Sequence, residues 1–220
     1  EWVKKSIQIP RKLAAADFRL EVPSRLDGKA VANVIGVIEN QAPTRHLRME
    51  VVLSNSELHA DMGRDLAKVA LVERHHGTGK IQFGLVHGFG FDAPCAVAST
   101  VAHDCHHMLV VGTDDSNMAI AANKLAEFGG GQVVVKNSEV IGLVELNIAG
   151  LMSTERAEIV AQKAAGILEG FRACGCAIDN PNMQLSLLAL VVIPELRISD
   201  KGLVDVNRFE FLPVVQGMTE

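Results

Sequence analysis

Residues 98–115 read ASTVAHDCHHMLVVGTDD, and the predicted fold can be built outward from this stretch. Met108 to Gly112 is a short apolar run, typical of a buried strand. Asp114 or Asp115 can cap a following helix by accepting a hydrogen bond from a free main-chain N–H group. Ahead of the strand stand three histidines, an aspartate and a cysteine. The stretch therefore predicts a polar loop, a strand and a helix in succession, with a candidate chemical site in the loop.

The residues after this stretch predict two helices and a hairpin. Apolar residues recur at helical spacing from Met118 to Phe128, and the three glycines 129–131 then end that helix. The further elements are a hairpin within 132–146, a longer helix from Ser153 or Thr154 to just before Gly175, and an apolar run at 183–193 that fits a strand or a helix.

Strands dominate the residues before this stretch. The four predicted strands are Val31–Ile38, Leu47–Leu53, Leu66–Val72 and Ile81–His87. Short strands are also expected at Ser6–Ile9 and within Leu203–Leu212, pairing with β-structure outside this sequence. Hairpins mixed with strand-to-helix steps predict an α+β fold, with a mixed or mainly antiparallel sheet and two or more packed helices.

The composition excludes several classes of protein. Apolar residues make up 48% of the 220, enough for a sizeable core. The formal charge is -5 with no basic cluster, so we expect no nucleic-acid partner. No apolar run reaches the roughly 18 residues that span a membrane, and the first ten residues do not resemble a secretory signal. The four cysteines are not spaced as a disulfide framework, which favours a reducing cytoplasm.

The polar loop has more than one interpretation. His103, Asp104 and His106 are possible metal ligands, but a closed zinc site needs four ligands and a strand would point neighbouring side chains to opposite faces. The loop can instead transfer protons or contact a substrate, because histidine titrates near neutral pH and an adjacent aspartate can fix its tautomer. A purely structural role at a buried turn remains equally open. Adjacent Cys105 and His106 seldom reach the geometry of a nucleophile and its base.

Several ordered motifs resemble the C-terminal region of bacterial adenine deaminase. The resemblance runs from about residue 15 to about residue 212. The motifs are STVAHDCHHMLVVGT at 99–113, AANKL at 121–125, GGG at 129–131, IAGLMS at 148–153 and VIPELR at 192–197, together with ERHHGTG at 73–79 and GFG at 88–90. Cys105 stands where serine is expected in many relatives, and His107 where asparagine is expected.

The resemblance implies an amidohydrolase that converts adenine and water into hypoxanthine and ammonia. In that family a TIM-like barrel holds one or two divalent metals, manganese or iron, and the metal-bound water attacks the purine. This sequence lacks the His-x-His metal motif and the eightfold strand–helix alternation of a barrel, which needs about 250 residues. The metal chemistry is therefore expected in a barrel outside this chain, which we expect to bind no metal and to be inactive alone.

The resemblance also implies a domain division and a set of site residues. Residues 1–25 would link to the β-structure beside the barrel, 26–200 would form the α+β domain, and 201–220 a tail strand. The 73–79 and 99–107 loops are expected over the barrel mouth, in the same or a neighbouring subunit. The expected catalytic residues are His103 and Asp104, and the expected substrate-binding residues are Arg74, Ser99 and His106.

The expected partners are adenine, a barrel in cis or in trans, and further copies of the enzyme in a homo-oligomer, with a role in purine salvage. Two other functions remain open. The domain can be a non-catalytic scaffold for the barrel or the oligomer, in which case loop substitutions lower stability and not turnover. An independent metal- or ligand-binding module would bind stoichiometric metal by itself.

Overall fold

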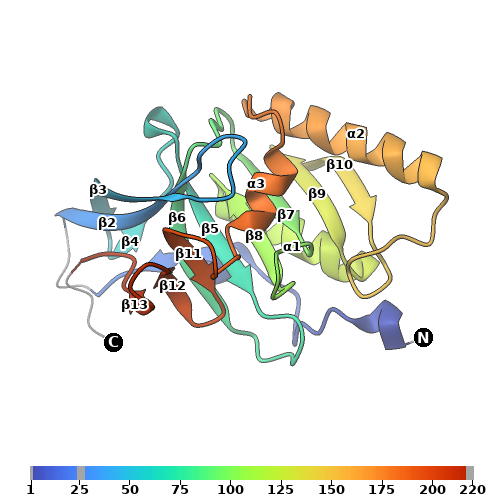
Figure 1. Ribbon diagram of the computed structural model, residues 1–220, viewed down its shortest axis with the longest axis horizontal. Helices are drawn as coiled ribbons and strands as arrows, with labels where there is room; N and C mark the ends of the chain where they lie inside the picture. The colour runs from blue at the N-terminus through green and yellow to red at the C-terminus, as the bar shows by residue number, and fades with distance from the viewer. Residues whose placement is uncertain (1, 24–27, 217–220) are drawn as a thin grey trace.

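The computed structural model describes residues 2–23 and 28–216, and its main element is a ten-stranded sheet (Figure 1). The strand order is β1-β4-β3-β2-β6-β5-β8-β7-β9-β10. Neighbouring strands pair antiparallel except β2 and β6, which pair in parallel. The strands are β1 Leu20–Glu21, β2 Gly28–Gly36, β3 Arg45–Ser54, β4 Glu57–Leu58, β5 Leu66–Val72, β6 Ile81–His87, β7 Cys95–Ser99, β8 Met108–Gly112, β9 Gly131–Lys136 and β10 Glu139–Glu145.

A second, smaller sheet and the helices complete the fold. The small antiparallel sheet has the order β11-β12-β13. Its strands are β11 Leu196–Ser199, β12 Gly202–Asp205 and β13 Glu210–Leu212. The α-helices are α1 Asp115–Phe128, α2 Ala157–Ala173 and α3 Pro181–Leu187. The 3-10 helices are η1 Trp2–Lys5, η2 Ala15–Phe18 and η3 Met62–Arg64. The prediction of an α+β fold with a mainly antiparallel mixed sheet is confirmed.

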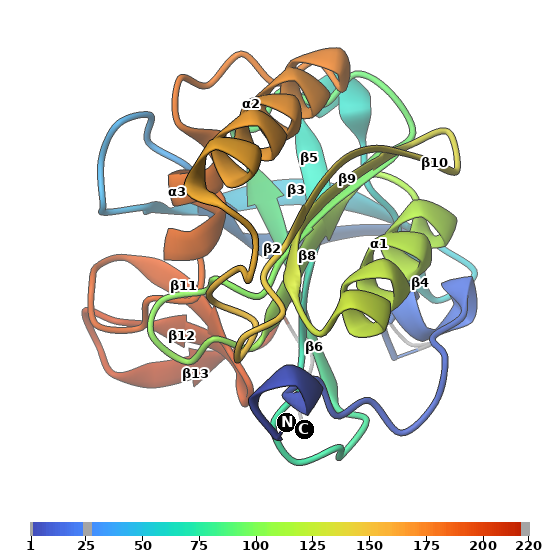
Figure 2. The same cartoon turned by 90° about the vertical axis from the view of Figure 1, so that its right-hand side faces the viewer.

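Helices cover both faces of the large sheet. Figure 2 shows α1 and α2 on opposite sides of β8 and β9. Successive residues of a strand point to opposite faces, so Val110 packs in the core under α1 whereas Val111 packs in the core under α2. The α2 core also contains α3 and buried residues of the small sheet. This double burial explains why β8 is apolar at every position.

Three local predictions need correction. Ser6–Ile9 lies outside any strand, and the Gln8 N–H donates to the Arg74 carbonyl (2.8 Å). Helix α2 begins at Ala157 and not at Ser153, because the Ser153 hydroxyl accepts a hydrogen bond from the Glu155 N–H (3.2 Å) in a turn before the helix. The strands within Leu203–Leu212, β12 and β13, pair with β11 and with each other inside this chain. The apolar run at 183–193, for which strand and helix were both open, begins within α3 and continues as turns. The proposed division at residues 25 and 200 stays a prediction.

Loops that are distant in sequence meet at one end of the molecule. The β5–β6 loop, the β7–β8 loop and the N-terminal segment all lie in the lower half of both views, which share a vertical axis. The Ala149 N–H donates to the Val3 carbonyl (2.8 Å), which attaches the turn after β10 to the same end. The candidate site residues are found here.

Candidate functional site

Arg74 is the centre of this end of the molecule. Its side chain is 1% exposed and donates to three segments. Nε donates to the His106 carbonyl (2.6 Å), one terminal nitrogen donates to the Ser6 hydroxyl (3.1 Å), and the other donates to the Ala149 carbonyl (3.0 Å). Burial lowers the pKa of this guanidinium, although arginine stays charged near neutral pH. Arg74 therefore fixes the histidine loop, residues 99–107, against the N-terminal segment and the turn after β10.

Glu73 organises the loop that carries Arg74. Its carboxylate accepts hydrogen bonds from the main-chain N–H groups of His75 (2.5 Å), His76 (2.8 Å) and Thr78 (3.0 Å), and from the Thr78 hydroxyl (2.9 Å). Burial opposes ionisation, but these hydrogen bonds favour the charged form and hold the pKa of Glu73 at about 2. Glu73 is thus a buried anion that shapes the 73–80 loop.

His103 is positioned by α3. Its Nδ1 is hydrogen-bonded to the Ser186 hydroxyl, and its main-chain N–H donates to the Ser186 carbonyl (3.2 Å). Ser186 is buried, so the contact fixes the orientation of the ring. The other ring nitrogen, Nε2, makes no hydrogen bond with the described residues. A fixed imidazole with one free nitrogen can exchange a proton or bind a polar ligand group.

His106 and His107 each have a buried ring nitrogen without a partner. Nδ1 of each is buried and forms no hydrogen bond within residues 2–23 and 28–216. Burial, followed by electrostatic interaction with His103 and Arg74, lowers the pKa of His106. Burial, followed by electrostatic interaction with His75, lowers the pKa of His107, whose ring lies 4.6 Å from that of His75. Both imidazoles are therefore neutral at pH 7.

The comparisons with known proteins assign the sequence of this chain to a family. The family described as "Adenine deaminase C-terminal domain" matches residues 41–210. The chain belongs to the adenine deaminase C-terminal domain family. Adenine deaminase 3 of Rhizobium meliloti (strain 1021) is 51% identical over 212 residues, covering 96% of this chain and 35% of that protein. Adenine deaminase of Roseobacter denitrificans is 50% identical over 216 residues, 98% of this chain and 36% of that protein.

A more distant relative shows the same partial coverage. Adenine deaminase of Moorella thermoacetica is 42% identical over 215 residues, 98% of this chain and 36% of that protein. The chain spans about a third of the length of the curated relatives it matches. The resemblance to the C-terminal region of adenine deaminase is thereby confirmed.

Within this family domain, the other two predicted site residues have contrasting environments. Ser99 is fully buried at the end of β7, where its hydroxyl donates to the Val101 carbonyl (3.2 Å) and accepts from the Val101 N–H (3.0 Å). Asp104 is exposed and forms no hydrogen bond or ion pair with the described residues. Ser99 therefore shapes the start of the histidine loop, whereas Asp104 is free to meet another molecule or another part of the polypeptide.

Two neighbours of the loop were missed by the sequence reasoning. Ser186 binds His103 from 83 residues further along the chain. Asp200, in the turn between β11 and β12, raises the pKa of His107 by its charge and thus partly opposes the effect of burial. No local sequence signal marks either residue, because the fold alone brings them to the loop. The adjacent Cys105 and His106 form no nucleophile–base pair, since the Cys105 thiol donates to the Ala102 carbonyl (3.8 Å).

The donor atoms of the loop do not fit a metal ion. In the part of the chain that the structure describes, no three histidine, cysteine, aspartate or glutamate side chains are placed to hold one. His103 uses Nδ1 for Ser186, and the Nδ1 atoms of His106 and His107 are buried. The set of His103, Asp104 and His106 considered from the sequence is thus not assembled as a metal site.

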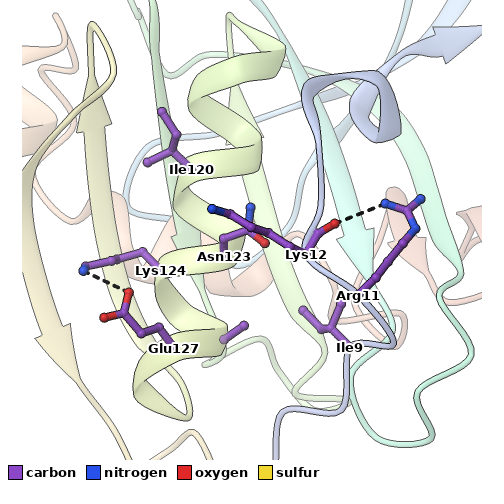
Figure 3. Close-up of a pocket in the computed structure, with 8 residues that line it drawn as sticks. Ile9, Arg11, Lys12, Ile120, Asn123, Lys124 and Glu127 are labelled. Carbon is purple, nitrogen blue, oxygen red and sulfur yellow. Dashed lines mark hydrogen bonds and ion pairs between the residues drawn. The ribbon is translucent and has the colours of Figure 1, made fainter.

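A groove elsewhere is a weaker candidate. It has a volume of about 470 Å³ and lies between the N-terminal segment and α1 (Figure 3). Most of its polar groups are already paired: Arg11 with Asp17, Lys124 with Glu127 (3.0 Å), and the Asn123 side chain with the Leu13 main chain (2.7 and 2.9 Å). The groove is therefore a seam between packed segments.

Among the described residues, no helix is long and apolar enough to cross a membrane.

Proposed function

We propose that this chain is the C-terminal part of an enzyme that deaminates adenine hydrolytically, giving hypoxanthine and ammonia. Family membership and relatives named adenine deaminase support this reaction. The observation that carries the role of this domain is the fixed imidazole of His103, which has Nδ1 on Ser186 and Nε2 free. That nitrogen is available to hold a purine edge or to relay a proton near the reacting atoms.

The metal chemistry belongs, in this proposal, to the two thirds of the relatives' length that this chain does not match. A bound manganese or iron ion would there supply a nucleophilic water. The loop residues of this chain do not fit a metal, so we assign no metal step to them. The chain alone is expected to be inactive.

The histidine loop supplies neutral hydrogen-bonding groups. The lowered pKa values of His106 and His107 keep both rings uncharged at pH 7. Because Nδ1 of each ring is buried, Nε2 is the nitrogen that can meet a ligand, and in a neutral imidazole it donates or accepts according to the tautomer. Asp104, exposed beside His103, can orient a group brought to the loop.

Arg74 and Ser99 act through the main chain in this proposal. Both are buried, and their polar atoms bind main-chain groups or the Ser6 hydroxyl. They are positioning residues for the loop that carries His103. Their predicted direct contact with substrate remains a prediction, and the geometry favours the indirect role.

The test is adenine turnover in a polypeptide of the relatives' full length that contains this chain, called here the long form. His103→Ala is expected to lower kcat/KM at least about tenfold, a loss of about 1.4 kcal/mol of transition-state stabilisation. Asp104→Ala tests the second residue. His59→Ala is the matched control, because His59 is an exposed histidine outside this end of the molecule.

A scaffold role is the second candidate, favoured by the buried contacts of Arg74 and Ser99. It predicts that His103→Ala and Asp104→Ala change stability or assembly and leave kcat and KM unchanged. That result would refute a role of the loop in the reaction. A cytoplasmic location, a homo-oligomer and a place in purine salvage are further parts of the proposal, to be tested by fractionation, sedimentation and growth on adenine.

A further inference from the structure

An apolar patch on the small sheet is exposed to solvent. We define the Phe209 patch as Val191, Val204, Phe209 and Phe211, which line one hollow. Phe209 is 84% exposed and Phe211 56%. Such a gathering of exposed apolar side chains marks an interaction surface more often than chance.

The backbone at Phe209 is in a conformation of unfavourable energy. Its φ is +54°, a left-handed conformation that a bulky side chain rarely adopts. The residue stands in the turn just before β13, with its ring in solvent. The Phe209 ring makes no aromatic or cation–π contact with another described residue. A strained residue with an exposed aromatic ring indicates a function outside this fold.

The patch occupies the outer face of the small sheet. Val204 and Phe211 are directly opposite each other in the β12–β13 pair, so their side chains share a face. Their neighbours Leu203 and Leu212 point the other way and pack in the core. A hollow of about 340 Å³ lies over the outer face, lined by Val191, Ser199, Asp200, Lys201, Val204, Phe209, Glu210 and Phe211.

Asp200 relates the hollow to the histidine loop. It lines the hollow, and its charge acts on His107 and Cys105 of the loop. Asp200 forms no hydrogen bond or ion pair with the described residues. A partner surface that covers the Phe209 patch and donates a hydrogen bond to Asp200 would therefore lie close to the histidine loop.

We propose that the Phe209 patch is where the rest of the long form packs against this domain. The occupant is the polypeptide that makes up the other two thirds of the relatives' length, since this chain matches 35% and 36% of two of them. The proposal rests on the proposed function, because it places that polypeptide next to the histidine loop. It identifies the contact by which the loop and the remaining part of the enzyme are held together.

Cysteine labelling measures whether the patch is covered. Phe209→Cys, Phe211→Cys and Val52→Cys are made singly in the 220-residue chain and in the long form, each with Cys105→Ser. Cys105 is the exposed native cysteine, and the other three are buried. Val52 is the control, because it is 66% exposed on β3 of the large sheet. Maleimide labelling at each introduced cysteine is followed by mass spectrometry, and adenine turnover of each long form is measured in parallel.

Both patch cysteines are expected to label about tenfold or more slowly in the long form, as when the patch is open in under about a tenth of molecules. Val52→Cys is expected to label equally fast in both. Equal labelling of the patch cysteines in both polypeptides would overturn the proposal, as would equal protection of Val52→Cys. Slow labelling in the isolated chain that speeds up on dilution would also overturn it, because a second copy would then cover the patch.

The turnover measurement separates the two proposals. A protected patch in a long form that does not deaminate adenine supports the docking contact and refutes the proposed reaction. A deaminase whose patch cysteines label freely supports the reaction and refutes the docking contact.

Discussion

Arg74→Ala tests the buried contacts that hold the histidine loop. The substitution removes donors from the His106 carbonyl (2.6 Å), the Ser6 hydroxyl (3.1 Å) and the Ala149 carbonyl (3.0 Å). A buried acceptor left without a donor costs about 1–3 kcal/mol. The substitution also removes a buried charge that has no carboxylate partner, which offsets part of this loss of stability. We therefore expect the free energy of unfolding to fall by about 2–4 kcal/mol.

The assay is urea unfolding of the 220-residue chain combined with hydrogen exchange. Exchange should accelerate in three segments together, namely residues 3–8, 99–107 and 147–150, because Arg74 binds all three. Arg172→Ala is the matched control, since Arg172 is an exposed arginine in the last turn of α2, and it should change stability by less than about 0.5 kcal/mol. A loss below about 1 kcal/mol for Arg74→Ala, or unchanged exchange in the loop, would refute the reasoning.

Arg74→Lys separates positioning from substrate contact. Lysine keeps the charge but lacks the planar fork that reaches several acceptors at once. A positioning residue predicts that Arg74→Lys lowers stability and kcat of the long form together. An altered KM for adenine with unchanged stability would show instead that Arg74 contacts the purine.

Three further changes probe the same end of the molecule and the helix that follows it. Glu73→Gln should cost about 2–3 kcal/mol at pH 7, measured by urea unfolding. The folded pKa of Glu73 lies at about 2, below its ordinary 4.5, so this contribution is present above pH 4.5 and is lost as the pH falls toward 2; a Gln variant as stable as the parent at pH 7 would contradict it. The pKa of His107 is lowered in the folded state, so this residue contributes to the free energy of unfolding above pH 6.5 and loses that contribution as the pH falls through its folded pKa. His107→Asn should therefore reduce the fall in the free energy of unfolding below pH 6.5. The same acid slope in parent and variant would show that His107 is not buried as a neutral ring. Asp114→Ala should cost about 1 kcal/mol in thermal unfolding, since the Asp114 carboxylate accepts from the Asn117 N–H (2.8 Å) at the start of α1, and an unchanged melting temperature would exclude the cap.

Local signals predicted much of the sheet and the first helix. β5, β6 and β8 have the predicted bounds, because each is a short, mainly apolar run bounded by polar residues or glycine. The Asp114 cap is confirmed, and the glycines after Phe128 end α1 as expected. Local chemistry decides such elements before the rest of the chain is considered.

Elements that depend on the whole fold were missed. β7, Cys95–Ser99, consists of small residues apart from Val97, and it is a strand because β8 and β9 pair with its two edges. The start of α3 carried a readable signal, since Asn180 caps it and Pro181 occupies its first turn. The apolar run that follows hid this signal.

The sequence located the loops of the candidate site better than it predicted the environments of their residues. Residues 73–79 and 99–107, both expected to be loops, meet in the structure, where His75 Nε2 is hydrogen-bonded to the Cys105 carbonyl (2.9 Å). Sequence spacing did not distinguish the buried Arg74 from the exposed Asp104. The approach of Ser186 and Asp200 depends on the packing of α3 and the small sheet.

The most direct test of the account is hypoxanthine formation from adenine, with added manganese or iron(II), by the 220-residue chain and by the long form. The account predicts turnover by the long form and none by the 220-residue chain, which places the metal chemistry outside these residues. Metal-dependent turnover by the 220-residue chain alone would contradict it and would make His103, His106 and His107 the first residues to examine as metal ligands.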